Sequence, residues 1–135
     1  MAPEGPNTAR LTVQNATGEE LPLDTYEDGK TCSGRLTLHN GVPENDIVTV
    51  RISAAVPFTL TARGADAPGL TGGVTYCTVA VTFDPRAGET YLAIYRAGGG
   101  KCFLQVGRRT SERFAAKATY VVEPSARQRD EPACR

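Results

Sequence analysis

Four cysteines have the most definite chemistry in this sequence: Cys32, Cys77, Cys102 and Cys134. They are widely spaced, and neither a C-x-x-C pair nor a neighbouring histidine completes a zinc site. An even number of cysteines in a small chain with many turns is typical of disulfides, which form in oxidising compartments. The sequence therefore predicts two disulfides, no metal or cofactor, and a periplasmic or extracellular protein.

The single histidine, His39, is the residue that a Ser-His-Asp or Cys-His hydrolase would need. It stands before an Asn-Gly turn, and no serine lies in a G-x-S-x-G motif. Catalytic sites need several convergent groups, so we interpret His39 as a polar residue at a strand end. The acids Asp24, Glu27 and Asp28 lack the spacing of a calcium loop and predict a solvated turn.

Two further segments resemble binding motifs. The run Gly98–Lys101 has the glycines of a phosphate loop, but it lacks the earlier glycine and the Ser or Thr that must follow the lysine. We expect a hairpin tip there. Arg108, Arg109 and Arg113 form a basic cluster that an anion or an acidic partner would recognise, although Glu112 interrupts it. The alternative is a surface patch without function.

The composition excludes several classes of protein. Among 135 residues, 15 Lys and Arg balance 15 Asp and Glu, so the net charge of zero argues against nucleic-acid binding driven by bulk charge. Hydrophobic residues make up 40% of the chain, which is enough for a folded core. No apolar run reaches the roughly 18 residues that a transmembrane helix needs.

Short alternating runs rich in Thr and Val, separated by Gly, Pro, Asn and Asp, predict an all-β protein. We expect a two-layer antiparallel β-sandwich, Ig-like or Greek-key, with about eight strands and at most one short helix near 110–117. The candidate strands are Leu11–Asn15, Leu21–Tyr26, Arg35–His39, Ile47–Ser53, Phe58–Ala62, Val74–Phe83, Thr90–Arg96, Cys102–Gly107 and Thr119–Glu123.

The ends of the chain differ in composition from its middle. Residues 1–9 predict a flexible arm, residues 10–123 a single sandwich domain, and residues 124–135 an extended tail. A tail has no use for a free cysteine at its end, so we expect a disulfide through Cys134 to tether it to the domain. The N-terminus lacks a secretory pattern, and the export prediction therefore requires that a signal peptide has been removed.

The strands between Val74 and Gly107 predict a three-stranded meander. If Arg96 lies opposite Cys102, then Leu92 and Ile94 share one face of the sheet with the aliphatic side chains of both neighbouring strands. In that register Cys77 and Cys102 flank the middle strand, about 9–10 Å apart, which is too far for a disulfide. We therefore expect each of them to pair with Cys32 or Cys134.

The segment Phe83-Asp84-Pro85-Arg86-Ala87-Gly88-Glu89-Thr90-Tyr91 lies between Cys77 and Cys102. It resembles the F-x-P-x-x-G-x-x-Y hairpin of small bacterial envelope proteins and lipoproteins, most of them uncharacterised. The resemblance covers about a quarter of the chain, and Pro85 and Gly88 supply its turn chemistry. It implies a signal peptide, export and a compact β domain, but no catalytic or ligand-binding residue. The lipid-bearing cysteine of a lipoprotein is not seen near residue 1.

These observations favour a non-enzymatic, monomeric envelope module that binds a protein or another envelope component. Its contact surfaces would be the loops 27–34, 64–73 and 97–101, because loops carry function on rigid β scaffolds. We expect no nucleic-acid partner, and membrane attachment only if the precursor is lipidated. The alternative is a small secreted hydrolase, or an inhibitor of an enzyme, that uses His39 or the clustered acids.

Overall fold

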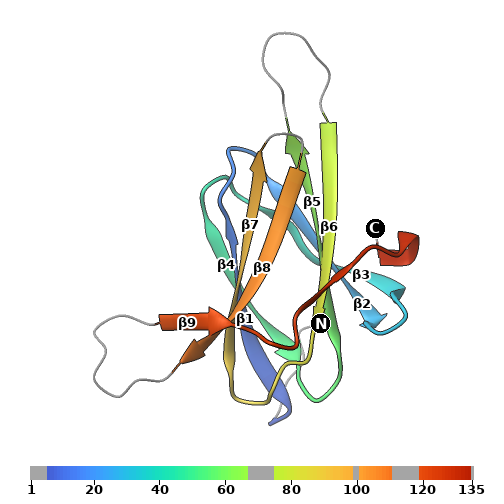
Figure 1. The fold of residues 1–135 in the computed structure, drawn as a ribbon, viewed down its shortest axis with the longest axis vertical. Helices are drawn as coiled ribbons and strands as arrows, with labels where there is room; N and C mark the ends of the chain where they lie inside the picture. The colour runs from blue at the N-terminus through green and yellow to red at the C-terminus, as the bar shows by residue number, and fades with distance from the viewer. Residues whose placement is uncertain (1–5, 67–74, 99–100, 111–118, 135) are drawn as a thin grey trace.

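The computed structural model describes residues 6–66, 75–98, 101–110 and 119–134, which form two five-stranded sheets packed face to face (Figure 1). The strands are β1 (Thr8–Asn15), β2 (Leu21–Asp28), β3 (Ser33–Val42), β4 (Ile47–Ser53), β5 (Phe58–Asp66), β6 (Thr75–Phe83), β7 (Thr90–Gly98), β8 (Lys101–Thr110), β9 (Thr119–Val122) and β10 (Arg127–Arg129). Sheet A has the order β4-β1-β7-β8-β9, and sheet B the order β10-β6-β5-β2-β3. The predicted all-β, two-layer sandwich is confirmed, and only the pairing of β1 with β7 is parallel among the described strand pairs.

Alternation of side chains along each strand builds the core between the two sheets. On β1, Leu11 and Val13 are fully buried, whereas Arg10 is exposed on the opposite side of the strand. The largest side chains buried between the sheets are aromatic: Phe83, Tyr91 and Tyr95. Phe83 from sheet B and Tyr91 from sheet A lie with ring centroids 5.0 Å apart, so this pair joins the two layers.

The predicted meander is wrong, because β6 and β7 belong to different sheets. Residues 84–89 connect the layers as an arch, in which Gly88 has φ +81° and the Tyr91 hydroxyl accepts a hydrogen bond from the Arg86 N–H at 2.8 Å. Pro85 and Gly88 therefore shape a turn between layers, not a hairpin within one sheet. The local turn chemistry is compatible with both, so the sequence alone did not distinguish them.

The predicted pairing of β7 with β8 is correct, but its register is wrong by one residue. Arg96 lies opposite Phe103, and Cys102 lies opposite Ala97. A shift of one residue turns every side chain of a strand to the other face. Leu92 and Ile94, which were predicted to face the core, therefore lie on the outer face of sheet A.

The size of Tyr95 explains why this register is preferred. Its ring is buried and reaches across the sandwich to Gly64 on β5, where the methyl group of an alanine would overlap the phenol. Glycine at this position leaves the space that the ring occupies. Aromatic side chains bury more apolar surface than aliphatic ones, so β7 turns Tyr91 and Tyr95 inward and leaves Leu92 and Ile94 outside.

All four cysteines form disulfides, as predicted, but the expected pairing of Cys77 and Cys102 with Cys32 and Cys134 is wrong. Cys77 on β6 is bonded to Cys102 on β8, with their Cα atoms 6.0 Å apart. The predicted separation assumed one continuous sheet, whereas the two strands face each other across the sandwich. Cys32 is bonded to Cys134, with Cα atoms 5.2 Å apart, so the tail is tethered to the domain as expected.

The ends of the domain differ from the prediction in detail. Strand β1 already begins at Thr8, so residues 8 and 9 do not belong to an arm. The tail contains β10, which the sequence did not predict, and a 3-10 turn at Pro132–Cys134. The helix expected near 110–117 lies outside the described residues apart from Thr110, which ends β8. No described segment is a helix of the length and hydrophobicity needed to cross a membrane.

Candidate binding surface

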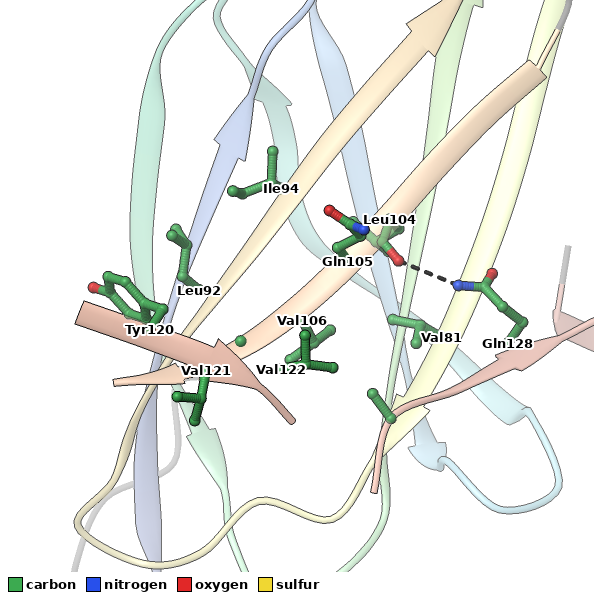
Figure 2. Close-up of a pocket in the computed structure, with 12 residues that line it drawn as sticks. Val81, Leu92, Ile94, Leu104, Gln105, Val106, Tyr120, Val121, Val122 and Gln128 are labelled. Carbon is green, nitrogen blue, oxygen red and sulfur yellow. Dashed lines mark hydrogen bonds between the residues drawn. The ribbon is translucent and has the colours of Figure 1, made fainter. Parts of the chain in front are cut away.

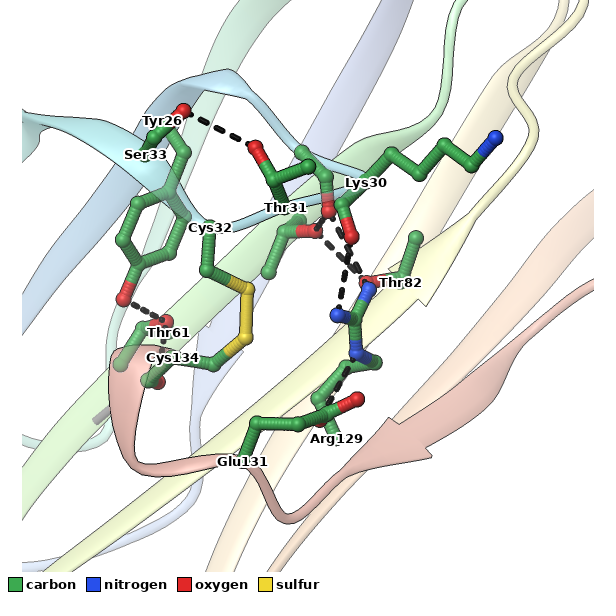
Figure 3. Close-up of a disulfide and its surroundings, with 12 residues drawn as sticks. Tyr26, Lys30, Thr31, Cys32, Ser33, Thr61, Thr82, Arg129, Glu131 and Cys134 are labelled. Carbon is green, nitrogen blue, oxygen red and sulfur yellow. Dashed lines mark hydrogen bonds and ion pairs between the residues drawn. A yellow bond between two sulfur atoms is a disulfide. The ribbon is translucent and has the colours of Figure 1, made fainter.

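The C-terminal tail covers the outer face of sheet B. It runs from β9 across β6 towards β2 and β3, and its end is held by the Cys32–Cys134 disulfide (Figures 1 and 3). Beneath it, Thr59, Thr61 and Thr82 are at most 1% exposed although they lie on the side of the sheet that faces away from the core. The tail thus turns a polar outer face into an interior.

Arg129 of β10 supplies most of the polar contacts beneath the tail. Its guanidinium donates hydrogen bonds to Gly29 O at 3.2 Å, to Lys30 O at 3.0 Å and to Thr82 Oγ1 at 3.2 Å (Figure 3). It also forms an ion pair with Glu131 at 3.0 Å, and this hydrogen bond lowers the pKa of the Glu131 carboxyl. One cationic side chain therefore fixes the turn after β2, strand β6 and the tail together.

The outer face of sheet A is not covered by the described part of the tail, and we call it the open face. Its residues form rows that run across the strands. In the row nearest the arch, Arg51 lies opposite Arg10, and Arg10 lies opposite Thr90. Arg108 on β8 lies opposite Tyr91, so the next residue, Arg109, stands level with Thr90 and extends this row. Its partner on β9 is Tyr120. Three arginines thus stand along one end of the open face.

The middle of the open face is uncharged and mixes aliphatic side chains with threonine and glutamine. In the second row the partners are Thr49, Thr12, Leu92, Gly107 and Val122, in strand order from β4 to β9. In the third row they are Ile47, Gln14, Ile94 and Gln105. Val122 is 82% exposed and Ile47 is 56% exposed, although both are large apolar side chains. These two side chains lie on the opposite edge strands β9 and β4, whereas Leu92 and Ile94 on the central strand β7 are half-buried.

The far end of the open face is again basic. Arg96 lies opposite Phe103, which is 54% exposed, and Lys101 follows towards the hairpin tip. Among the outward-facing strand residues of sheet A in the described ranges, five are basic and none is acidic. This one-sided charge contrasts with the zero net charge of the whole chain. The basic residues are Arg10, Arg51, Arg96, Lys101 and Arg109.

A cleft of about 320 Å³ borders the open face between β8–β9 and the segment that leads into β10 (Figure 2). Leu92, Ile94 and Val122 contribute to its wall, and Gln128 crosses it to donate a hydrogen bond to Leu104 O at 3.2 Å. The cleft therefore extends the uncharged middle of the open face towards the edge of the sandwich.

The structure does not bring His39 together with a nucleophile. His39 is on β3, where its Nδ1 accepts a hydrogen bond from the Gly41 N–H at 3.1 Å, and its backbone lies opposite Leu23. Within the described chain, the imidazole is thus bonded to backbone and not to a serine or a carboxylate. His39 therefore lies inside β3, which continues to Val42, and not at the strand end that the sequence predicted for it.

The acids of the predicted turn have separate local partners. Asp24 forms an ion pair with Arg35 at 3.3 Å. Asp28 accepts hydrogen bonds from the N–H groups of Lys30 and Thr31, which lower the pKa of its carboxyl. No group of three potential metal ligands occurs among the described residues. Asp24 and Glu27 thus lie within β2, where a solvated turn was predicted, and only Asp28 at the end of β2 shapes the turn that follows.

The basic cluster predicted around residue 108 is divided. Arg108 and Arg109 are consecutive on β8 and point to opposite sides of sheet A, so only Arg109 belongs to the open face. Arg113 lies outside the described residues. Sequence reasoning missed Arg10, Arg51 and Arg96, because they come from three strands that only the sheet order places together.

The predicted contact loops are described only in part. The loop 27–34 packs against the tail through Cys32 and through the carbonyls of Gly29 and Lys30. In the segment 97–101, Gly98 pairs with Lys101 as the hairpin tip that was predicted, and residues 99–100 lie outside the described ranges. Most of the loop 64–73 lies outside them as well.

Comparison with models of known protein families gave no match, and comparison with curated proteins gave no related sequence.

Proposed function

We propose that this protein is a non-enzymatic binding module that is exported to the periplasm or the cell exterior and attaches to a protein partner through the open face. The observation that carries the proposal is the difference between the two outer faces of the sandwich. One is closed by a tail that a disulfide locks in place, and the other presents exposed aliphatic side chains between two basic ends.

The disulfides support export. Cys32–Cys134 closes a separation of 102 residues and Cys77–Cys102 one of 25, so both restrict the unfolded chain. Bonds of this kind are typical of proteins that fold in an oxidising compartment. The envelope-type segment between Cys77 and Cys102 agrees with this assignment.

The arrangement of polar groups supports binding over catalysis. A hydrolase needs a nucleophile, a base and a group that orients the base, all within hydrogen-bond reach. In the described chain, His39 and the acids Asp24 and Asp28 each have a local partner of their own. An enzyme that uses His39 is the alternative that the experiment must exclude.

Capture from an envelope extract tests the proposal. The oxidised protein is expected to retain a discrete partner, and His39→Ala to retain it equally. Val122→Glu is expected to lose it, because Val122 is an aliphatic side chain of the open face, on the edge strand β9, that is 82% exposed. Leu36→Glu is the matched control, since Leu36 is an aliphatic side chain on sheet B that is 47% exposed.

Two results would contradict the proposal. Loss of capture by His39→Ala together with a hydrolytic activity that the same change abolishes would favour the enzyme. Equal loss of capture by Val122→Glu and Leu36→Glu would show that the open face is not the contact surface.

A further inference from the structure

We infer that the partner of the open face is acidic: a protein surface with carboxylates around an apolar centre. The inference rests on the proposed function and specifies the chemistry of its partner. It combines three observations: the unbalanced charge of the open face, its division into an uncharged middle and basic ends, and the absence of any described segment of the tail over it.

The charge of the open face is not neutralised by the described residues around it. Arg10 and Arg51 stand directly opposite each other on neighbouring strands, an arrangement of like charges that destabilises a sheet. Neither they nor Arg96 take part in any of the ion pairs found among the described residues. Glu89 lines the same hollow as Arg10 and Arg51 but is not in any of these ion pairs either. A bound carboxylate would remove the repulsion between the two arginines.

The distribution of apolar and charged groups matches a protein interface. Interfaces between proteins have an apolar centre that becomes buried and a polar rim, and arginine and tyrosine are frequent among the residues that dominate their energy. On the open face, Leu92 and Ile94 of the central strand β7 lie between the basic ends, and Val122 adds an exposed aliphatic side chain on the edge strand β9. Arginines lie at both ends, where they would steer and orient an acidic partner.

The same features argue against other occupants. A second copy of the chain would bring arginines against arginines. The tail of the same chain is held on sheet B by Cys134. Sugars stack on aromatic platforms, whereas the exposed aromatic side chains of the open face, Phe103 and Tyr120, lie apart at its two ends.

Titration of the oxidised, ¹⁵N-labelled protein with a random copolymer of glutamate and tyrosine tests the inference. The copolymer is expected to shift amide resonances of β1, β7 and β8 and to leave those of β2 and β5 unchanged. Affinity should fall about tenfold between about 0.05 M and about 0.3 M salt, because screening weakens attraction between exposed charges. Polyglutamate, which lacks aromatic groups, should bind more weakly.

Two double variants that change the net charge equally distinguish binding through the open face from binding through the overall charge of the protein. Arg10→Glu with Arg51→Glu is expected to weaken binding of the copolymer about tenfold or more, since it reverses two contacts of the basic row. Lys30→Glu with Arg63→Glu places the same charge change at exposed positions away from the open face, in the turn after β2 and on β5, and should change affinity less than about twofold. Circular dichroism of all variants checks that the sandwich is intact.

Each opposite result overturns the inference. Equal weakening by the two double variants would indicate non-specific attraction, and no binding of the copolymer would exclude acidic recognition. Tighter binding to vesicles of anionic phospholipid than to the copolymer would identify a membrane surface instead. Capture of the envelope partner by the Arg10→Glu, Arg51→Glu variant as well as by the original protein would leave the proposed binding function intact. That result would refute the inference that the partner is acidic.

Discussion

At the scale of single residues, Tyr91 connects the arch to the core. Its ring is fully buried against Phe83, and its hydroxyl accepts the hydrogen bond from the Arg86 N–H. Burial raises the pKa of this phenol above its ordinary value of 10.0, because the charged phenolate is poorly solvated inside the sandwich. A raised pKa means that the folded protein holds the proton more tightly than the unfolded chain.

The alkaline stability of the protein should therefore depend on Tyr91. The contribution of this group is present below pH 10 and is lost as the pH rises through the raised pKa. Tyr91→Phe is expected to cost about 1 kcal/mol at neutral pH, through the lost hydrogen bond, and to reduce the decline of stability at alkaline pH. Urea unfolding at about pH 8 and about pH 10.5 measures both effects. Parallel pH profiles of the two proteins would contradict this role.

At the scale of elements, β7 shows why a strand sequence can be read in two registers. Thr90–Gly98 alternates tyrosines with aliphatic residues, so both of its faces are apolar. The pattern predicts a strand and its pairing with β8 but does not decide which face is buried. The space beside Gly64 on the opposite sheet decides it, and no local pattern in β7 contains that information.

A pair of identical substitutions tests which face of sheet A is outside. Val122 is 82% exposed and Val106 is 4% exposed, although they lie on adjacent strands of the same sheet. Val→Thr keeps the shape of the side chain and adds a hydroxyl, which is costly only where it is buried. We expect Val106→Thr to lower the free energy of unfolding by about 1–2 kcal/mol and Val122→Thr by less than about 0.5 kcal/mol. Equal effects in chemical unfolding would refute the assignment of the faces.

At the scale of the whole molecule, the two disulfides have different tasks. Cys77–Cys102 joins the two sheets, whereas Cys32–Cys134 holds the tail over sheet B. Replacing either pair by serine should lower stability by about 3–5 kcal/mol. Only the loss of Cys32–Cys134 should expose the tail to trypsin, which cleaves after arginine, at Arg127 and Arg129.

Peptide mapping without reduction and limited proteolysis check this assignment. Linked peptides containing Cys77 and Cys102, and Cys32 and Cys134, are the expected products. Rapid cleavage of the tail in the Cys77→Ser, Cys102→Ser variant as well would show that the tail depends on the whole fold, not on its own disulfide.

The sequence by itself determined the properties that depend on local chemistry. The alternation of apolar and polar residues identified nine of the strands, and the even number of cysteines identified disulfides. The glycine-rich segment before Lys101 predicted a hairpin tip correctly, whereas the Asn-Gly pair expected to form a turn after His39 is part of β3. These features depend on side-chain periodicity, turn geometry and thiol chemistry, which act over a few residues.

Only the tertiary structure decided which strands share a sheet, and with that the pairing of the cysteines and the composition of the open face. Cys77 and Cys102 bond because an arch moves the chain from one layer to the other between β6 and β7. Arg10, Arg51, Arg96 and Arg109 face one side because sheet A collects strands from the whole length of the chain. The physical reason is that the sheet to which a strand belongs depends on packing between distant segments. This packing must provide space for the large rings of Tyr91 and Tyr95. The spacing of neighbouring residues in the sequence carries no information about it.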